Sequence, residues 1–172
     1  MQKVVWGMVA IYLAIGLALW SNKAFAAPEL VRFADQRFAP GTIVVKNRER
    51  SLYLVHRGGT ALRYQVAVGK RGKAWTGQTY ITGMHVRPAW SPPAEVKRDL
   101  PHLPVVIAGG APNNPMGVAA MTLAGGEYAI HGTNRPGLIG RAVSYGCIRM
   151  RNADIADLFA RVGVNTRVVA VN

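Results

Sequence analysis

The chain has 172 residues, of which 21 are lysine or arginine and 8 are acidic, so its formal net charge is +13. Half of the residues are apolar, which excludes a disordered polycation, and the length fits one compact domain. The single cysteine, Cys147, excludes an internal disulfide framework and cysteine-rich zinc or iron–sulfur sites.

The N-terminal segment has the pattern of a secretory signal. Lys3 is the only charged residue before the apolar run 4–20, and Ala24-Phe25-Ala26 provides a small-x-small cleavage site. We therefore expect a signal peptide over 1–26, cleaved after Ala26, and an exported mature domain over 27–172 in the periplasm or cell envelope. An uncleaved membrane anchor stays an alternative, because an apolar run of this length is close to the lower limit for spanning a bilayer.

The mature chain is predicted to be mainly β. Apolar and β-branched patterns predict strands at 42–45, 51–55, 61–68, 105–108, 117–123, 128–131 and 166–171, and a strand pair within 75–84. Five prolines between Pro88 and Pro104 predict a loop there. Helical periodicity is confined to 152–162, with Asn152 as the expected N-cap. Many short strands with one helix after Cys147 predict a β-sandwich or a partly open barrel.

The segment from His131 to Arg149 carries the candidate chemistry. Its glycines, prolines and polar residues predict a long loop, and long loops within compact domains are usually functional. Cys147 precedes the expected helix and lies near Arg149, a setting that lowers the pKa of a thiol. His131 is the candidate general base, and the amides around Gly146 and Cys147 are candidate oxyanion donors. From the residues alone, an inert buried cysteine remains the alternative.

Two motifs in this region are His131-Gly132-Thr133-Asn134 and Ser144-x-Gly146-Cys147-Ile148-Arg149-Met150. They resemble the catalytic domain of the YkuD-type L,D-transpeptidases, which cross-link peptidoglycan. The resemblance implies a mainly β fold, a β-sandwich or mixed sheet with one helix after Cys147. Upstream, Val68-Gly69-Lys70, the Pro-x-Trp-x-Pro-Pro loop around Trp90 and Asn114-Pro115-Met116-Gly117 also agree. The match extends over nearly the whole mature chain, with a domain core at about 42–170.

The resemblance implies that Cys147 is the nucleophile and His131 the general base. It implies a thioester with a tetrapeptide stem, release of the terminal D-Ala, and a 3–3 type cross-link or D-amino acid exchange, without a metal or organic cofactor. The expected substrate-binding residues are Arg149, Ser144, Gly146, Tyr145, Trp90 and Asn134. The expected partners are peptidoglycan stem peptides, with an envelope protein as an alternative acyl acceptor. We expect a monomer that binds no nucleic acid.

Two positions depart from the family pattern. Tyr145 stands where most relatives have a second histidine, and a tyrosine, with a pKa of about 10, cannot carry a proton near neutral pH. Trp75-Thr76-Gly77 replaces the usual Thr-Pro-x-Gly. Two other functions stay open: an L,D-carboxypeptidase or other hydrolase that uses the same site, and a non-catalytic wall-binding protein attracted by the basic charge to anionic envelope polymers.

Overall fold

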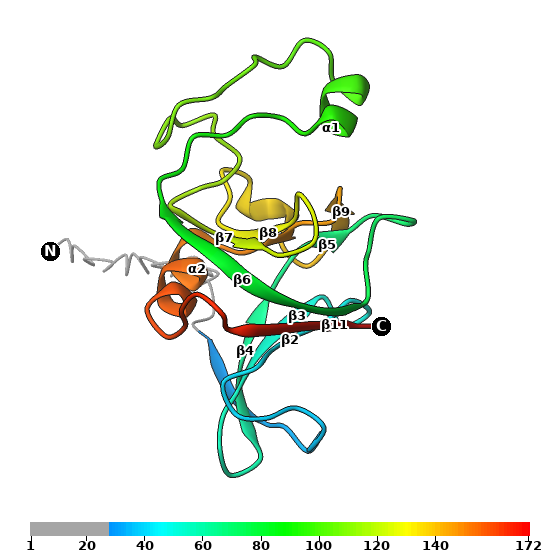
Figure 1. Cartoon of the computed structure of the whole chain (residues 1–172), viewed down its shortest axis with the longest axis vertical. Coiled ribbons are helices and arrows are strands. Elements are labelled where there is room, and N and C mark those ends of the chain that lie inside the picture. The colour runs from blue at the N-terminus through cyan, green and yellow to red at the C-terminus, as the bar shows by residue number, and fades with distance from the viewer. Residues whose placement is uncertain (1–27) are drawn as a thin grey trace, which may run out of the picture.

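The computed structural model describes residues 28–172, and β-strands dominate it (Figure 1). The strands are β1 (Glu29–Arg32), β2 (Ile43–Lys46), β3 (Ser51–Val55), β4 (Thr60–Gln65), β5 (Val68–Gly69), β6 (Gly77–Val86), β7 (Ala119–Leu123), β8 (Ala129–His131), β9 (Ala142–Ser144), β10 (Ile148–Arg149) and β11 (Arg167–Val171). The helices are α1 (Ala94–Asp99), α2 (Asn152–Phe159) and a short 3-10 turn, η1 (Pro136–Leu138). The predicted signal peptide lies outside the described residues.

Nine strands form one mixed sheet in the order β1-β4-β3-β2-β11-β6-β7-β8-β10, and β5 pairs with β9. β11 joins the two halves, since it runs parallel to β2 and antiparallel to β6. The predicted mainly β mixed fold is confirmed. The strand pair expected within 75–84 is wrong, because β6 is one ten-residue strand whose register shifts between Ile81 and Gly83. That irregularity lets β6 bend from β11 to β7 without a turn.

The proline-rich segment differs most from expectation. The predicted strand at 105–108 is reduced to an isolated bridge between Trp90 and Ile107. The predicted loop contains α1, so the expectation of a single helix is wrong. α1 begins directly after Pro93. The first amides of a helix have no acceptor within the helix, so a proline, which lacks the N–H group, is tolerated there. Glu95 lies in the first turn, where a negative charge interacts favourably with the helix dipole. We call residues 87–118, which connect β6 to β7, the α1 segment. In Figure 1 this segment extends beyond the sheet, above β7 and β8.

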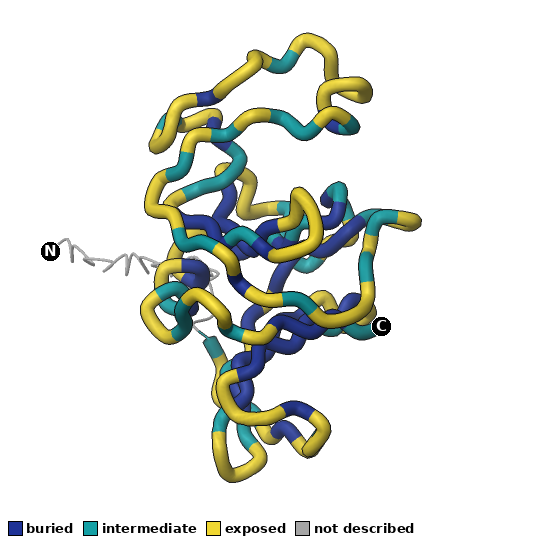
Figure 2. The backbone as a smooth tube through the Cα atoms, in the orientation of Figure 1, coloured by how far each residue is buried: buried dark blue, intermediate teal, exposed yellow. Residues whose placement is uncertain are grey.

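The hydrophobic core consists of two clusters, one on each face of the half of the sheet that contains β2, β3 and β4. The larger cluster includes Ile43, Tyr64, Met121, Ile148 and Leu158, so it joins both halves of the sheet to α2. Figure 2 shows that burial is concentrated in the central strands, whereas the α1 segment is mostly exposed or half-buried. Among residues 28–172, neither helix is long and apolar enough to cross a bilayer.

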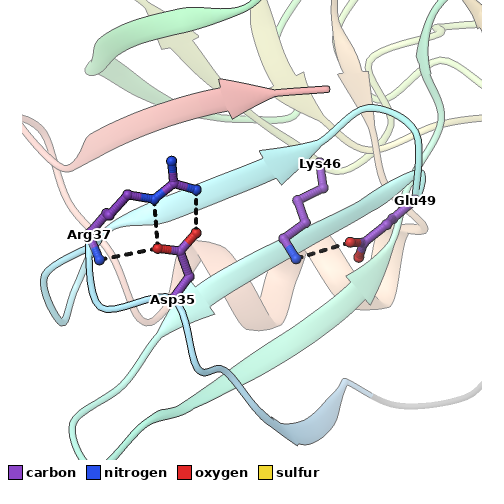
Figure 3. Close-up of polar contacts among 4 residues, drawn as sticks. All are labelled: Asp35, Arg37, Lys46 and Glu49. Atoms are coloured by element: carbon purple, nitrogen blue, oxygen red, sulfur yellow. Dashed lines mark hydrogen bonds and ion pairs between the residues drawn. The ribbon is translucent and has the colours of Figure 1, made fainter.

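A smaller cluster occupies the opposite face, where Phe33 and Phe38 cover Tyr53. Two ion pairs border it, Asp35–Arg37 at 2.6 Å and Lys46–Glu49 at 3.0 Å (Figure 3). Both faces of this half are therefore covered, which makes it a rigid base for the half that carries β7, β8 and β10.

Candidate active site

The pairing of β8 with β10 brings His131 and Cys147 to the same cavity. The two strands are parallel, with Arg149 opposite His131. Cys147 and Arg149 are two residues apart, so their side chains share one face of the chain. All three side chains line a cavity of about 390 Å³. The cysteine and histidine, 16 positions apart in the sequence, are thus joined by one strand pair.

The cavity is enclosed by two segments besides these strands. The turn between β7 and β8 forms one wall through residues 125–128, and the Cys147 Sγ lies 3.9 Å from the Glu127 carbonyl oxygen. The α1 segment contributes apolar side chains, among them Val96, Leu100 and Ile107. The site therefore combines a polar reacting centre with an apolar cover, as small-molecule and peptide sites commonly do.

The loop before Cys147 is held by two internal hydrogen bonds and by the conformation of Gly146. The Ser144 hydroxyl donates to the Cys147 carbonyl at 2.6 Å and accepts from the Gly146 N–H at 3.1 Å. The Gly146 φ is +126°, and a Cβ there would lie 2.3 Å from the Tyr128 ring. Of the two amides predicted as oxyanion donors, the Gly146 N–H is engaged by Ser144, whereas the Cys147 N–H has no acceptor among the described residues and stays a candidate.

Trp75 fixes the same loop from outside the cavity. Its indole N–H donates to the Gly146 carbonyl at 3.0 Å, and its ring stacks on Tyr128 with centroids 6.0 Å apart and an interplanar angle of 4°. The Asn47 side chain in turn donates to the Trp75 carbonyl at 2.8 Å. Because a trans peptide is planar, holding the Gly146 carbonyl toward Trp75 points the Cys147 N–H the opposite way.

His131 is buried and neutral. Its Nδ1 lies 2.6 Å from the Gly132 carbonyl oxygen, which can only accept, so Nδ1 carries the proton and Nε2 is unprotonated. Burial, with a smaller contribution from the Arg149 charge, lowers the pKa of His131 to about 4. A neutral imidazole with an unprotonated Nε2 is the form that a general base requires.

The predicted lowering of the thiol pKa is wrong. Burial raises the pKa of Cys147, and the nearby Arg149 charge only partly opposes this effect. The helix contributes no comparable effect, because α2 begins five residues later at Asn152 and dipole effects fade beyond the first turn. Burial also lowers the pKa of Arg149, whose Nε is buried with no hydrogen-bond partner among residues 28–172.

Tyr145 faces the α1 segment. Its hydroxyl donates to Asp99 at 2.6 Å, and the Lys70 ammonium lies 3.8 Å from its ring centroid and 3.7 Å from the same carboxylate. Tyr145 also lines the cavity. Its position in the loop before Cys147 therefore links that loop to α1.

Six of the eight predicted site residues line the cavity, namely Cys147, His131, Arg149, Tyr145, Trp90 and Asn134. Ser144 and Gly146 do not line it and instead shape the loop that presents Cys147. The Asn134 side-chain amide donates to the Pro112 carbonyl at 3.4 Å. Among residues 28–172, no cluster of three histidine, cysteine or acidic side chains is arranged to hold a metal ion.

Asn152 has a role that sequence reasoning missed. It does not cap α2: Arg151 is the N-cap, and no side chain caps that end. The Asn152 Oδ1 accepts from the Thr133 N–H at 3.0 Å and the Val118 N–H at 3.3 Å. It therefore ties the loop after His131 to the chain entering β7. An asparagine at the start of a helix fits the sequence pattern of an N-cap whether or not it caps the helix. Only the tertiary contacts show that Asn152 accepts from two loop amides and does not act as a cap.

Known proteins share this sequence pattern and fold. The model of the L,D-transpeptidase catalytic domain named YkuD matches residues 40–169. "Probable L,D-transpeptidase YbiS" of Escherichia coli K12 is 39% identical over 135 residues, which are 73% of this chain and 43% of that protein. "Probable L,D-transpeptidase ErfK/SrfK" of Salmonella typhimurium is 38% identical over 76% of this chain and 44% of that protein. The chain thus spans less than half the length of these two relatives.

Solved structures agree on the fold. An L,D-transpeptidase from Mycobacterium smegmatis superposes with a TM-score of 0.58 at 15% identity, covering 76% of this chain and 58% of that one. A Brucella melitensis structure titled "Probable carnitine operon oxidoreductase caia" is 40% identical, with a TM-score of 0.55, and covers 80% of this chain and 89% of that one. Because the family model spans most of the chain, the protein belongs to the YkuD-type L,D-transpeptidase catalytic domain family.

Proposed function

We propose that the protein is an exported, cysteine-dependent L,D-transpeptidase that acts on peptidoglycan tetrapeptide stems. The observation that carries the proposal is the meeting of Cys147 and a neutral His131 at one cavity. The residues supply a nucleophile, a base with an unprotonated Nε2, and the Cys147 N–H as an oxyanion donor. Together these are the parts that acyl transfer through a thioester needs.

In the first half-reaction, the Cys147 sulfur attacks the carbonyl carbon of the third stem residue while His131 Nε2 takes the thiol proton. The Cys147 N–H donates to the developing oxyanion. The C–N bond to the terminal D-Ala then breaks, and the imidazolium returns its proton to the departing amine. A thioester on Cys147 and free D-Ala result.

The resting pair is uncharged, because burial disfavours both the thiolate and the imidazolium. Proton transfer therefore accompanies attack on the carbonyl and does not precede it. Charge then appears only in the transition state, where the Cys147 N–H and the nearby Arg149 stabilise it. This differs from a cysteine site that rests as a thiolate–imidazolium pair.

Substrate binding involves the other cavity residues. The unpartnered Arg149 Nε suits a carboxylate of the stem, because a guanidinium matches carboxylate geometry. Trp90, Asn134 and Tyr145 line the remaining surface available to the stem. Ser144 and Gly146 act through the conformation of the Cys147 loop.

In the second half-reaction an amine attacks the thioester and restores the thiol. We propose a stem amine, giving a 3–3 type link, or a free D-amino acid, giving exchange; an amine of an envelope protein is the alternative acceptor. Attack by water would make the protein an L,D-carboxypeptidase. An oxidoreductase function has no sequence support, since the chain contains no Gly-x-Gly-x-x-Gly dinucleotide motif.

The test uses protein purified after expression of the full chain, together with a Cys147→Ala variant. Each is incubated with disaccharide-tetrapeptide, with and without a D-amino acid, and the products are identified by mass spectrometry. We expect terminal exchange or dimer formation with the native protein only, and a thioester adduct on Cys147. A tripeptide product alone would favour the carboxypeptidase, and equal products from both proteins would overturn the cysteine mechanism.

A further inference from the structure

Glu127 differs from every other acidic side chain of the protein. All eight acidic residues lie within residues 28–172, and seven of them form ion pairs. The Glu127 carboxylate forms none and accepts no hydrogen bond from the described residues, although the chain carries 21 lysines and arginines. An acidic group without a cationic partner in so basic a protein is available to a cation from outside.

Glu127 lies at the reacting centre. It belongs to the β7–β8 turn, lines the cavity with Cys147, and is exposed to solvent. Its backbone carbonyl oxygen lies 3.9 Å from the Cys147 Sγ. The other acidic residue of the cavity, Glu95, is already paired with Lys73. Arg135 and Arg149 also line the cavity and would repel a cation, so Glu127 is the group there that attracts one.

A carboxylate at this place opposes the first half-reaction. Its charge adds to burial in raising the pKa of Cys147, so it disfavours loss of the thiol proton during attack. After acylation the balance reverses, because a thioester has no charge to repel. The molecule that must then approach carries an amine, which is an ammonium ion in neutral solution.

We propose that Glu127 is a specificity-determining residue that draws the cationic amine of the acyl acceptor to the Cys147 thioester. The inference rests on the proposed transpeptidase function. Because a carboxylate attracts an ammonium ion more strongly than it attracts water, Glu127 favours transfer of the acyl group to an amine over hydrolysis of the thioester. As the amide C–N bond forms and the C–S bond breaks, the ammonium loses two protons. One reaches sulfur through His131, and the other passes to solvent.

The test compares the two half-reactions in the native protein and in Glu127→Gln. Thioester formation with disaccharide-tetrapeptide is followed by intact mass, and the isolated acyl-enzyme is then mixed with a D-amino acid, with glycinamide, or with buffer alone. We expect Glu127→Gln to form the thioester at the native rate or faster. Its aminolysis by either amine falls roughly two- to fivefold, the size of one exposed charge pair, and its hydrolysis is unchanged.

Three controls separate charge at the site from other effects. Glu29→Gln makes the same change in net charge at Glu29, which pairs with Arg63 and does not line the cavity, so its transfer-to-hydrolysis ratio stays native. Glu127→Asp keeps the carboxylate and restores most of the aminolysis. Hydroxylamine, a nucleophile that is uncharged at neutral pH, reacts equally with the native and Glu127→Gln acyl-enzymes.

The possible outcomes distinguish the inference from the function on which it rests. A native ratio of transfer to hydrolysis in Glu127→Gln would overturn the role of Glu127 and leave the transpeptidase intact. Equal slowing of both half-reactions would assign Glu127 a structural role and also overturn the inference. If the native protein forms no thioester on Cys147, both proposals fail.

Discussion

The peptide between Gly146 and Cys147 is where single residues most directly control the chemistry. Gly146 has a φ of +126°, and the Tyr128 ring occupies the space that a Cβ would need. Trp75 holds its carbonyl, and Ser144 holds its N–H. These contacts leave the Cys147 N–H facing away from Trp75, so the proposed oxyanion donor is already oriented in the protein without substrate.

Trp75→Phe tests this arrangement. The substitution keeps an aromatic ring against Tyr128 but removes the donor to the Gly146 carbonyl. We expect a loss of about 1 kcal/mol in the free energy of unfolding, the usual net value of one hydrogen bond. We also expect slower thioester formation, because the Gly146–Cys147 peptide becomes free to rotate. Urea unfolding and intact-mass acylation rates measure the two effects.

Tyr128→Phe is the matched control for stability, since it changes the same ring pair while the Tyr128 hydroxyl has no hydrogen bond among the described residues. Its unfolding midpoint stays native. A native acylation rate in Trp75→Phe would show that the indole N–H does not orient the peptide.

At the scale of elements, α1 covers the cavity and is tied to the body of the domain by charged contacts. Asp99 accepts from Tyr145 and pairs with Lys70, and Glu95 pairs with Lys73. The Tyr145 and Lys70 contacts lower the pKa of Asp99, so the ties weaken in acid. Since these side chains are about one-third exposed or more, each of these contacts contributes little to stability.

Asp99→Ala removes both the hydrogen bond from Tyr145 and the ion pair with Lys70. We expect faster hydrogen exchange of the amides in α1 and a few-fold faster alkylation of Cys147 by iodoacetamide, because the apolar cover opens more often. The control is Lys97→Ala on the same helix, whose side chain has no hydrogen bond or ion pair among residues 28–172. Identical alkylation rates for both variants would show that Asp99 does not hold the cover in place.

At the scale of the whole molecule, burial of His131 couples stability to pH. The pKa is about 4 in the folded protein, against about 6.5 for an unperturbed histidine, so between these values the unfolded chain binds more protons. Stability is therefore complete above about pH 6.5 and declines as the pH falls toward about 4. Because His131 is only 3% exposed, the loss reaches about 3 kcal/mol at 1.36 kcal/mol per pH unit.

His131→Asn isolates this contribution, because asparagine does not titrate. We expect the difference in unfolding free energy between native protein and variant to shrink by about 3 kcal/mol as the pH falls from 7 to 4. Urea unfolding between pH 7 and 4 measures this difference. The other titratable groups are the same in both proteins, so their contributions cancel when the two unfolding free energies are subtracted. A difference that stays constant with pH would mean that His131 is not held neutral by burial.

The sequence by itself determined the parts that depend on local pattern. Short apolar, β-branched runs were enough to predict β2, β3, β7, β8 and β11, since a strand that is buried on both faces has an almost continuous apolar sequence. The motif residues were enough to identify the family and to predict that Cys147 and His131 share a site. The expectation of a lowered thiol pKa failed because it used neighbours in sequence, whereas burial depends on the complete fold.

Tertiary structure decided everything that depends on distant contacts. α1 formed within a proline-rich segment that also covers the cavity, and Asn152 became an acceptor for two loops in place of a helix cap. Trp75 donates a hydrogen bond to Gly146, which lies 71 positions further along the chain. Glu127 forms no ion pair with any of the described residues. Desolvation and long-range pairing are properties of the packed chain, so no local pattern specifies the protonation of His131 or the charge beside Cys147.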